Sequence, residues 1–105
     1  MLSTVTTAVG LSDADLVRRA QSGDAGCLGL LLSRHQAGMR AVAVVQLGVT
    51  DEVDDAVQDA TLTALRRIGD LRDPEAVGAW LRMIVRNGCR MRRRARTALP
   101  VNDLE

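Results

Sequence analysis

Hydrophobic residues recur at three- and four-residue intervals along most of this 105-residue chain, the spacing of α-helices that bury one face. The pattern predicts a first helix from about residue 13 to 22, with Ser12 as its N-cap and Gly23 ending it. A second helix is predicted from Asp24 to about Leu47, where Gly48 follows. The inward positions predicted for this second helix are Leu28, Leu31, Leu32, His35, Met39, Val42 and Ala43.

Two further helices are predicted in the second half of the chain. The third runs from about residue 51 to 68, and its buried face is predicted to hold Val53, Val57, Ala60, Ala64 and Ile68. The fourth begins after an Asp73 cap and Pro74 and reaches about Arg94. Its predicted inward residues are Val77, Trp80, Leu81, Ile84, Gly88 and Met91. No useful length alternates with a period of two, so we expect an all-α, compact three- to four-helix bundle.

The chain is long enough for one domain. Residues 1–11 lack helical periodicity and are predicted to form a mobile tail before a helical domain over residues 12–96. The N-terminus has neither the positive region nor the apolar run of a signal peptide, and no stretch approaches a membrane span. We therefore expect a soluble, cytoplasmic protein that does not enter a membrane.

Charge is divided unequally along the chain, although the formal net charge is only +1. All 14 basic residues are arginine. Residues 1–65 hold four arginines and eight acids, a balance of −4, whereas residues 66–96 hold ten arginines and three acids, a balance of +7. Such asymmetry indicates two different binding faces, one of them suited to nucleic acid.

The third predicted helix is unusually acidic, with five carboxylates among residues 51–59. Asp51, Asp55 and Asp59 are one turn apart, on the side opposite the predicted buried face, together with Leu62. Two readings remain open. The face is either an ordinary solvated surface or a docking surface for a basic partner, with Leu62 as an apolar anchor.

The fourth predicted helix carries a basic stripe. Arg82, Arg86, Arg90 and Arg93 are expected on the side away from Trp80 and Ile84. Favourable interaction with the helix dipole explains only two or three arginines near the C-terminal end. Guanidinium groups suit phosphate, so the stripe favours a nucleic-acid backbone as partner. Asn87, at the edge of the stripe, is either a surface residue or a reader of a base edge.

No pattern of an enzyme active site is found. The single histidine, His35, lies in an apolar stripe, where a packing role is favoured over that of a general base. Glycine-rich phosphate loops, metal clusters and nucleophile elbows are absent from the sequence. We predict a non-enzymatic protein without cofactor or metal. Cys27 and Cys89 lack metal-site spacing and are expected to be buried free thiols, with a thiol switch as a weaker alternative.

In order and spacing, these segments resemble region 2 of bacterial RNA polymerase sigma factors of the extracytoplasmic-function type. The resemblance spans about residues 12–105 and rests on "DLVRRAQSGD", "VDDAVQDATLTALRR" and "WLRMIVRN" followed by the arginine run. The ending "LPVNDLE" is similar to the start of the family's linker to a second DNA-binding domain, which implies a linker over residues 97–105. The resemblance thus implies that the chain is a fragment of a longer factor that carries this second domain.

The resemblance implies a role in transcription initiation. It implies docking on the clamp helices of the core RNA polymerase β′ subunit through Asp54, Asp55, Gln58, Asp59 and Leu62. It also implies that the segment after the acidic helix binds the non-template strand of the promoter's minus-ten element and helps to melt it. A flipped base would enter the loop Gly69–Asp73. The implied DNA-binding residues are Arg67, Asp70, Arg72, Arg82, Arg86, Asn87, Arg90 and Arg93.

A further partner implied by the family is an anti-sigma factor. The main alternative is a degenerate sigma-like helical module that binds a regulator and does not bind DNA.

Overall fold

The computed structural model describes residues 8–97, and within that range every regular element is helical. This confirms the predicted all-α bundle. The elements in chain order are α2 (Asp13–Gln21), α3 (Ala25–Leu47), α4 (Glu52–Arg67), the 3₁₀ turns η1 (Ile68–Asp70) and η2 (Pro74–Ala76), and α5 (Val77–Thr97).

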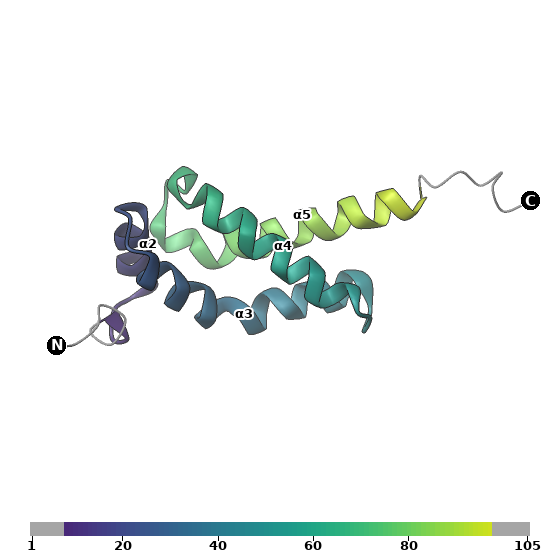
Figure 1. Ribbon diagram of the computed structural model, residues 1–105, viewed down its shortest axis with the longest axis horizontal. Coiled ribbons are helices and arrows are strands. Elements are labelled where there is room, and N and C mark those ends of the chain that lie inside the picture. The colour runs from purple at the N-terminus through teal and green to yellow at the C-terminus, as the bar shows by residue number, and fades with distance from the viewer. Residues whose placement is uncertain (1–7, 98–105) are drawn as a thin grey trace, which may run out of the picture.

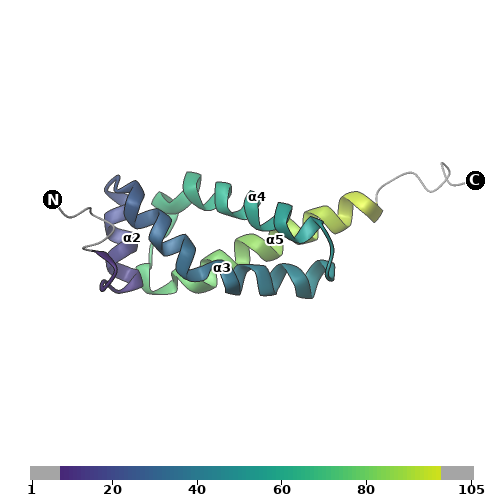
Figure 2. The same ribbon diagram turned by 60° about the horizontal axis from the view of Figure 1, so that its bottom comes forward.

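Helix α3 is the shared support of the bundle, because α2, α4 and α5 each pack against it. Helices α4 and α5 also pack against each other. The shorter α2 lies at one end of the bundle, beside the connection between α4 and α5 (Figures 1 and 2). There it contacts both η1 and η2. The turn between the acidic and basic helices is therefore supported by a helix from the beginning of the chain.

Local signals determine where α2 and α3 begin and end. The Ser12 side chain accepts a hydrogen bond from the Asp15 backbone N–H at 3.1 Å. Asp24 accepts one from the Cys27 N–H at 3.0 Å. Both bonds satisfy N–H groups that have no partner within the helix. Gly23 and Gly48 have φ values of 102° and 78°, which favour glycine where the chain leaves a helix.

The predicted buried face of α4 is confirmed, since Val53, Val57, Ala60, Ala64 and Ile68 are all buried. On α3, the predicted residues are buried or half-buried. The buried ones are Leu28, Leu31, Met39 and Ala43.

The predicted buried face of α5 was partly wrong. Val77 and Leu81 are buried as expected, but the stripe continues through Val85 and Cys89, while Met91 is 69% exposed. Residues four apart are offset by about 40° around a helix, so the buried side has turned by roughly 120° between Val77 and Cys89. Met91 falls on the far side of that turned face. Trp80, Ile84 and Gly88 are half-buried.

Of the predicted N-terminal tail, only residues 8–11 are among those described. Ala8 is buried, and Arg34 of α3 donates hydrogen bonds to the carbonyl oxygens of Val9 at 2.6 Å and Leu11 at 2.7 Å. Thr97, the first residue of the predicted linker 97–105, is instead the last residue of α5. Residues 1–7 and the remaining linker residues 98–105 lie outside the described part of the chain.

Candidate functional site

The acidic face of α4 is exposed along its length. Val53 and Val57 direct this helix against the core, which leaves the opposite side to solvent. The five predicted polymerase-binding residues are all exposed: Asp54, Asp55, Gln58, Asp59 and Leu62. Leu62 is 43% exposed and Leu65, which was not predicted, is 45% exposed. Two leucines three residues apart are neighbours on a helix surface, so together they form a small apolar area at the end of the acidic face.

Several of these carboxylates pair with arginines of the same chain. Arg40 of α3 pairs with Asp54, and Arg92 of α5 pairs with Asp59. Near the start of α4, Arg96 pairs with Glu52. Asp55 forms no ion pair within residues 8–97. The side chains of Asp54 and Asp59 remain 75% and 66% exposed, so they are still accessible from solvent.

The basic side of α5 is a row of exposed arginines one helical turn apart. Arg82, Arg86 and Arg90 are exposed, and none of them forms an ion pair in the described part of the chain. Asn87 is exposed next to Arg86. The i, i+4 spacing continues to Arg94, which sequence reasoning did not include among the site residues.

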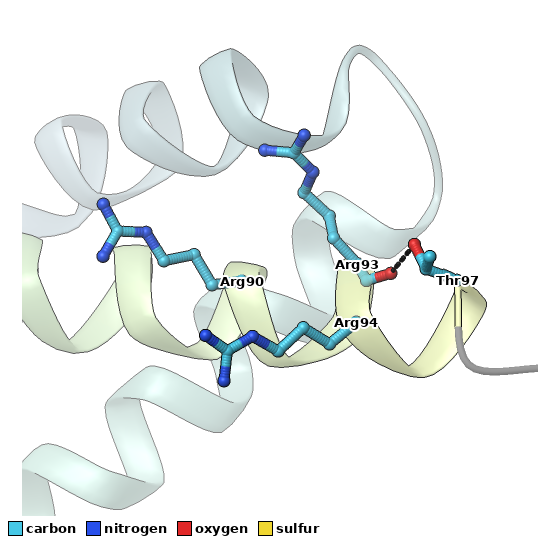
Figure 3. Close-up of a pocket in the computed structure, with 4 residues that line it drawn as sticks. All are labelled: Arg90, Arg93, Arg94 and Thr97. Carbon is cyan, nitrogen blue, oxygen red and sulfur yellow. Dashed lines mark hydrogen bonds between the residues drawn. The ribbon is translucent and has the colours of Figure 1, made fainter.

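Near the C-terminal end of α5, the side chains of Arg90, Arg93, Arg94 and Thr97 line an open hollow. Figure 3 shows Arg90 and Arg94 extending in the same direction along the helix, whereas Arg93 projects to another side. Arg93 donates a hydrogen bond to Gln46 Oε1 at 3.3 Å, which turns it toward α3. The Thr97 hydroxyl donates to the Arg93 carbonyl at 2.9 Å. Arg94 therefore continues the row of Arg82, Arg86 and Arg90 along the helix, and the predicted Arg93 projects beside it.

The loop between α4 and α5 presents charged side chains above an apolar base. Ile68 and Leu71 are buried, while Asp70 and Arg72 are exposed. Arg67 Nε donates to Asp70 Oδ2 at 3.2 Å, so two predicted DNA-binding residues are paired with each other. The Asp73 side chain accepts from the Glu75 N–H at 3.0 Å, so the predicted cap forms, but it caps the 3₁₀ turn η2 and α5 itself begins only at Val77.

Gln21 is a residue of this region that sequence reasoning missed. Its Nε2 group donates to the carbonyl oxygens of Ile68 at 2.9 Å and Leu71 at 2.8 Å. These contacts join residues 47 and 50 positions apart, and no local pattern around Gln21 indicates them.

His35 of α3 packs where α2, α3 and α5 meet, and its contacts are those of a structural residue. Its Nε2 atom lies 2.7 Å from Asp13 Oδ2, and Arg34 donates to the other oxygen of the same carboxylate at 3.1 Å. Burial alone would raise the pKa of Asp13, but the hydrogen bonds from His35 and Arg34 outweigh it and lower that pKa. A Cβ atom at Gly78 would lie 3.3 Å from His35 Cε1, so glycine permits α5 to approach this histidine.

Both cysteines are free and buried, as predicted. Burial raises the pKa of the Cys27 and Cys89 thiols, which keeps them in the unreactive protonated form. This argues against the thiol-switch alternative. No three His, Cys, Asp or Glu side chains in the described range are grouped to hold a metal ion. Over the same range, no helix combines the length and apolar character needed to cross a membrane.

Comparison with known proteins gives a consistent result. A family model described as Sigma-70 region 2 matches residues 31–98. The chain is similar to the ECF RNA polymerase sigma factor SigM of Mycobacterium tuberculosis H37Rv, with 37% identity over 94 residues, covering 90% of this chain and 48% of the relative. It is also similar to the ECF RNA polymerase sigma-E factor of Haemophilus influenzae, with 31% identity over 93 residues, covering 89% of this chain and 49% of that protein. The chain thus spans about half the length of these relatives. No solved structure matches it.

Proposed function

The chain belongs to the Sigma-70 region 2 family, and on this premise we propose that it acts in transcription initiation by binding core RNA polymerase and promoter DNA together. The acidic face of α4 docks on the clamp helices of the polymerase β′ subunit. The loop Gly69–Asp73 and the arginine row of α5 hold the non-template strand of the minus-ten element. This is a non-enzymatic role in the cytoplasm, and it requires no cofactor.

Docking through α4 is supported by the chemistry of its exposed face. Leu62 and Leu65 offer an apolar contact, and Asp55 and Gln58 supply charge and hydrogen-bonding groups beside it. A small apolar centre with a polar rim is the usual composition of a specific protein interface. Asp54 and Asp59 add negative charge that a basic partner can share with Arg40 and Arg92.

DNA binding is the best-supported part of the proposal, because Arg82, Arg86 and Arg90 form an exposed row without acidic partners in the described residues. Such a row is stabilised by an anionic ligand, since adjacent guanidinium groups otherwise repel one another. The loop lies at the N-terminal end of this row. In the proposed complex, Asp70 and Arg72 border a flipped base, Asn87 approaches it, and Arg93 and Arg94 extend the phosphate contacts.

Base flipping out of a duplex costs a few kcal/mol, which this small domain must recover through contacts to the strand. Docking on polymerase lowers the free energy that the domain itself must supply for flipping, because the polymerase already positions the DNA. The two binding faces therefore belong to one activity. We propose that residues 12–96 form the binding body and that residues 97–105 lead to a second domain in a longer factor.

An alternative function is binding of a protein regulator without DNA, and the apolar exposure near the end of α3 favours it. Val45 is 81% exposed and Val49 is 89% exposed, and Val45 lines a shallow hollow beside Arg86 of the arginine row, where a bound regulator would also cover that arginine. An anti-sigma factor would be such a regulator, and it is also a proposed partner of the DNA-binding form.

Co-purification with core polymerase tests the proposal. The chain is mixed with core enzyme, the complex is separated by size, and a fluorescent single strand carrying minus-ten sequences is titrated into each fraction. We expect the chain to elute with the core enzyme and the complex to bind the strand. Elution apart from the core enzyme would contradict docking, and docking without strand binding would favour the alternative.

A further inference from the structure

The loop Gly69–Asp73 is held from behind by one side chain of α2. The two N–H groups of the Gln21 carboxamide point to the carbonyls of Ile68 and Leu71, at 2.9 and 2.8 Å. These two carbonyls bracket the η1 turn, whose own backbone bond runs from the Leu71 N–H to the Ile68 carbonyl at 3.2 Å. Gln21 therefore binds both ends of a single turn.

This arrangement determines which way the turn faces. Ile68 and Leu71 are buried, and the residues between them, Gly69 and Asp70, are exposed. Apolar burial fixes the two ends toward the core, while Gln21 supplies a donor to the Leu71 carbonyl and a second donor to the Ile68 carbonyl, which already accepts the backbone bond of the turn. The exposed tip of the loop, including Asp70, is thereby presented in one conformation.

We propose that Gln21 is a positioning residue for base recognition, acting through the conformation of the loop Gly69–Asp73 without touching DNA. This inference rests on the proposed function. A preorganised loop loses less conformational entropy when a base enters it, and it excludes bases that do not fit. Loss of the Gln21 bonds should therefore reduce discrimination among bases more than overall affinity for single strands.

The decisive variant is Gln21→Met, which retains the length and helix propensity of glutamine but removes both donors. Gln36→Met is the matched control, since Gln36 is an exposed residue of α3 with no side-chain hydrogen bond in the described range. Gln21→Lys serves as a rescue, because an ammonium group can again donate to both carbonyls. Denaturant unfolding verifies that all three variants are folded.

Two measurements are made on the full chain. Hydrogen exchange of the Leu71 amide reports the turn, and in Gln21→Met we expect it to be faster by about tenfold, as in a locally opened segment. The second measurement reports discrimination among bases. In the presence of core polymerase, the chain selects from single strands that are randomised over a short window, and the selected bases are counted at each position. The preference ratio at the most selective position should fall by about fivefold, the lower end of a typical single-base effect. The salt slope should be unchanged, because no phosphate contact is lost.

The outcomes separate the inference from the proposed function. Faster exchange and a reduced ratio in Gln21→Met, with wild-type values in Gln36→Met and recovery in Gln21→Lys, would establish the positioning role. If the wild-type chain selects bases and Gln21→Met selects them equally well, the positioning role of Gln21 is overturned and the proposed function stands. Unchanged Leu71 exchange in Gln21→Met would overturn the positioning role as well. A wild-type chain that binds strands without any base preference would contradict both.

Discussion

The exposed faces of α4 and α5 differ in how their charges are paired within the molecule. On α4, Asp54 and Asp59 already interact with Arg40 and Arg92. On α5, Arg82, Arg86 and Arg90 have no acidic partner among the described residues. The two faces were expected from the sequence to be separate and opposite in charge, yet the acidic one is partly neutralised by the same chain.

The internal ion pairs of α4 should weaken the contribution of two of its acids to partner binding. In the proposed docking, a protein partner at α4 competes with Arg40 and Arg92 for two carboxylates, so we expect those acids to contribute less to binding than Asp55. An exposed ion pair is worth only about 0–1 kcal/mol, so the competition is easily won by a basic surface. The arginine row of α5 meets no such competition. We therefore expect docking to depend on few residues and DNA binding to be shared among many.

The largest expected effect comes from reversing the unpaired acid on α4. Asp55→Arg, combined with Leu62→Ala, should reduce core polymerase affinity by at least about 2 kcal/mol, the range of hot-spot residues at interfaces. Fluorescence anisotropy with labelled chain measures this. Glu75→Arg is the control, because it reverses an exposed acid outside the acidic face. Equal loss in both variants would mean that total charge, and not the α4 face, determines docking.

Substitutions in the arginine row should each reduce DNA affinity by a smaller amount than the change on α4 reduces polymerase affinity. Arg86→Ala with Arg90→Ala should lower single-strand affinity about tenfold and reduce the salt slope by roughly 1.4, from about 0.7 per lost phosphate contact. Titrations at several salt concentrations measure both values. Arg18→Ala with Arg19→Ala removes the same charge from α2 and should leave the slope close to that of wild type. An equal change in the two double variants would falsify the assignment of the row.

The ion pair between α4 and α5 can be tested by a double-mutant cycle. Asp59→Asn, Arg92→Gln and their combination should reveal a coupling free energy of about 0.2–1 kcal/mol in urea unfolding, since Asp59 is largely exposed. The coupling should decrease as salt is added. A coupling above this range would mean that the acidic face is committed to internal pairing and poorly available to a partner.

Acid titration gives the smallest expected effect and concerns an acid outside both faces. Hydrogen bonds from His35 and Arg34 hold the pKa of Asp13 below its usual 3.8. The folded state therefore binds this proton less readily than the unfolded state, so the stabilisation is present above pH 3.8 and is lost as the pH falls through the folded pKa. Asp13→Asn should show a weaker decline in unfolding free energy over this window. An identical decline in wild type and variant would exclude this linkage.

Much of the fold could be predicted because its determinants are local. Ser12, Asp24, Gly23 and Gly48 mark helix ends through contacts within a few residues, and the buried face of α4 follows from spacing alone. The α5 face was misjudged at Met91, where a small angular drift accumulates along a 21-residue helix. A helical projection that is aligned on the buried residues of the first turns therefore assigns the wrong side of the helix to the core near its C-terminal end.

The paired carboxylates and the Gln21 contacts could not be predicted for a different reason. Arg92 reaches Asp59 across 33 positions, and Gln21 reaches Leu71 across 50. Such contacts depend on how the helices are placed side by side and on the reach of long side chains. Charge patterning therefore located the two faces of the candidate site, but it could not indicate which charges would be neutralised within the chain.

Trp80 is the chain's single aromatic residue, half-buried where α5 packs against the core. With no tyrosine or phenylalanine present, intrinsic ultraviolet emission arises from one indole alone. Its wavelength should shift to the red when the bundle unfolds, and its intensity should change when a strand lies along the same helix. The protein thus contains its own spectroscopic reporter, which allows both transitions to be followed without attaching a dye.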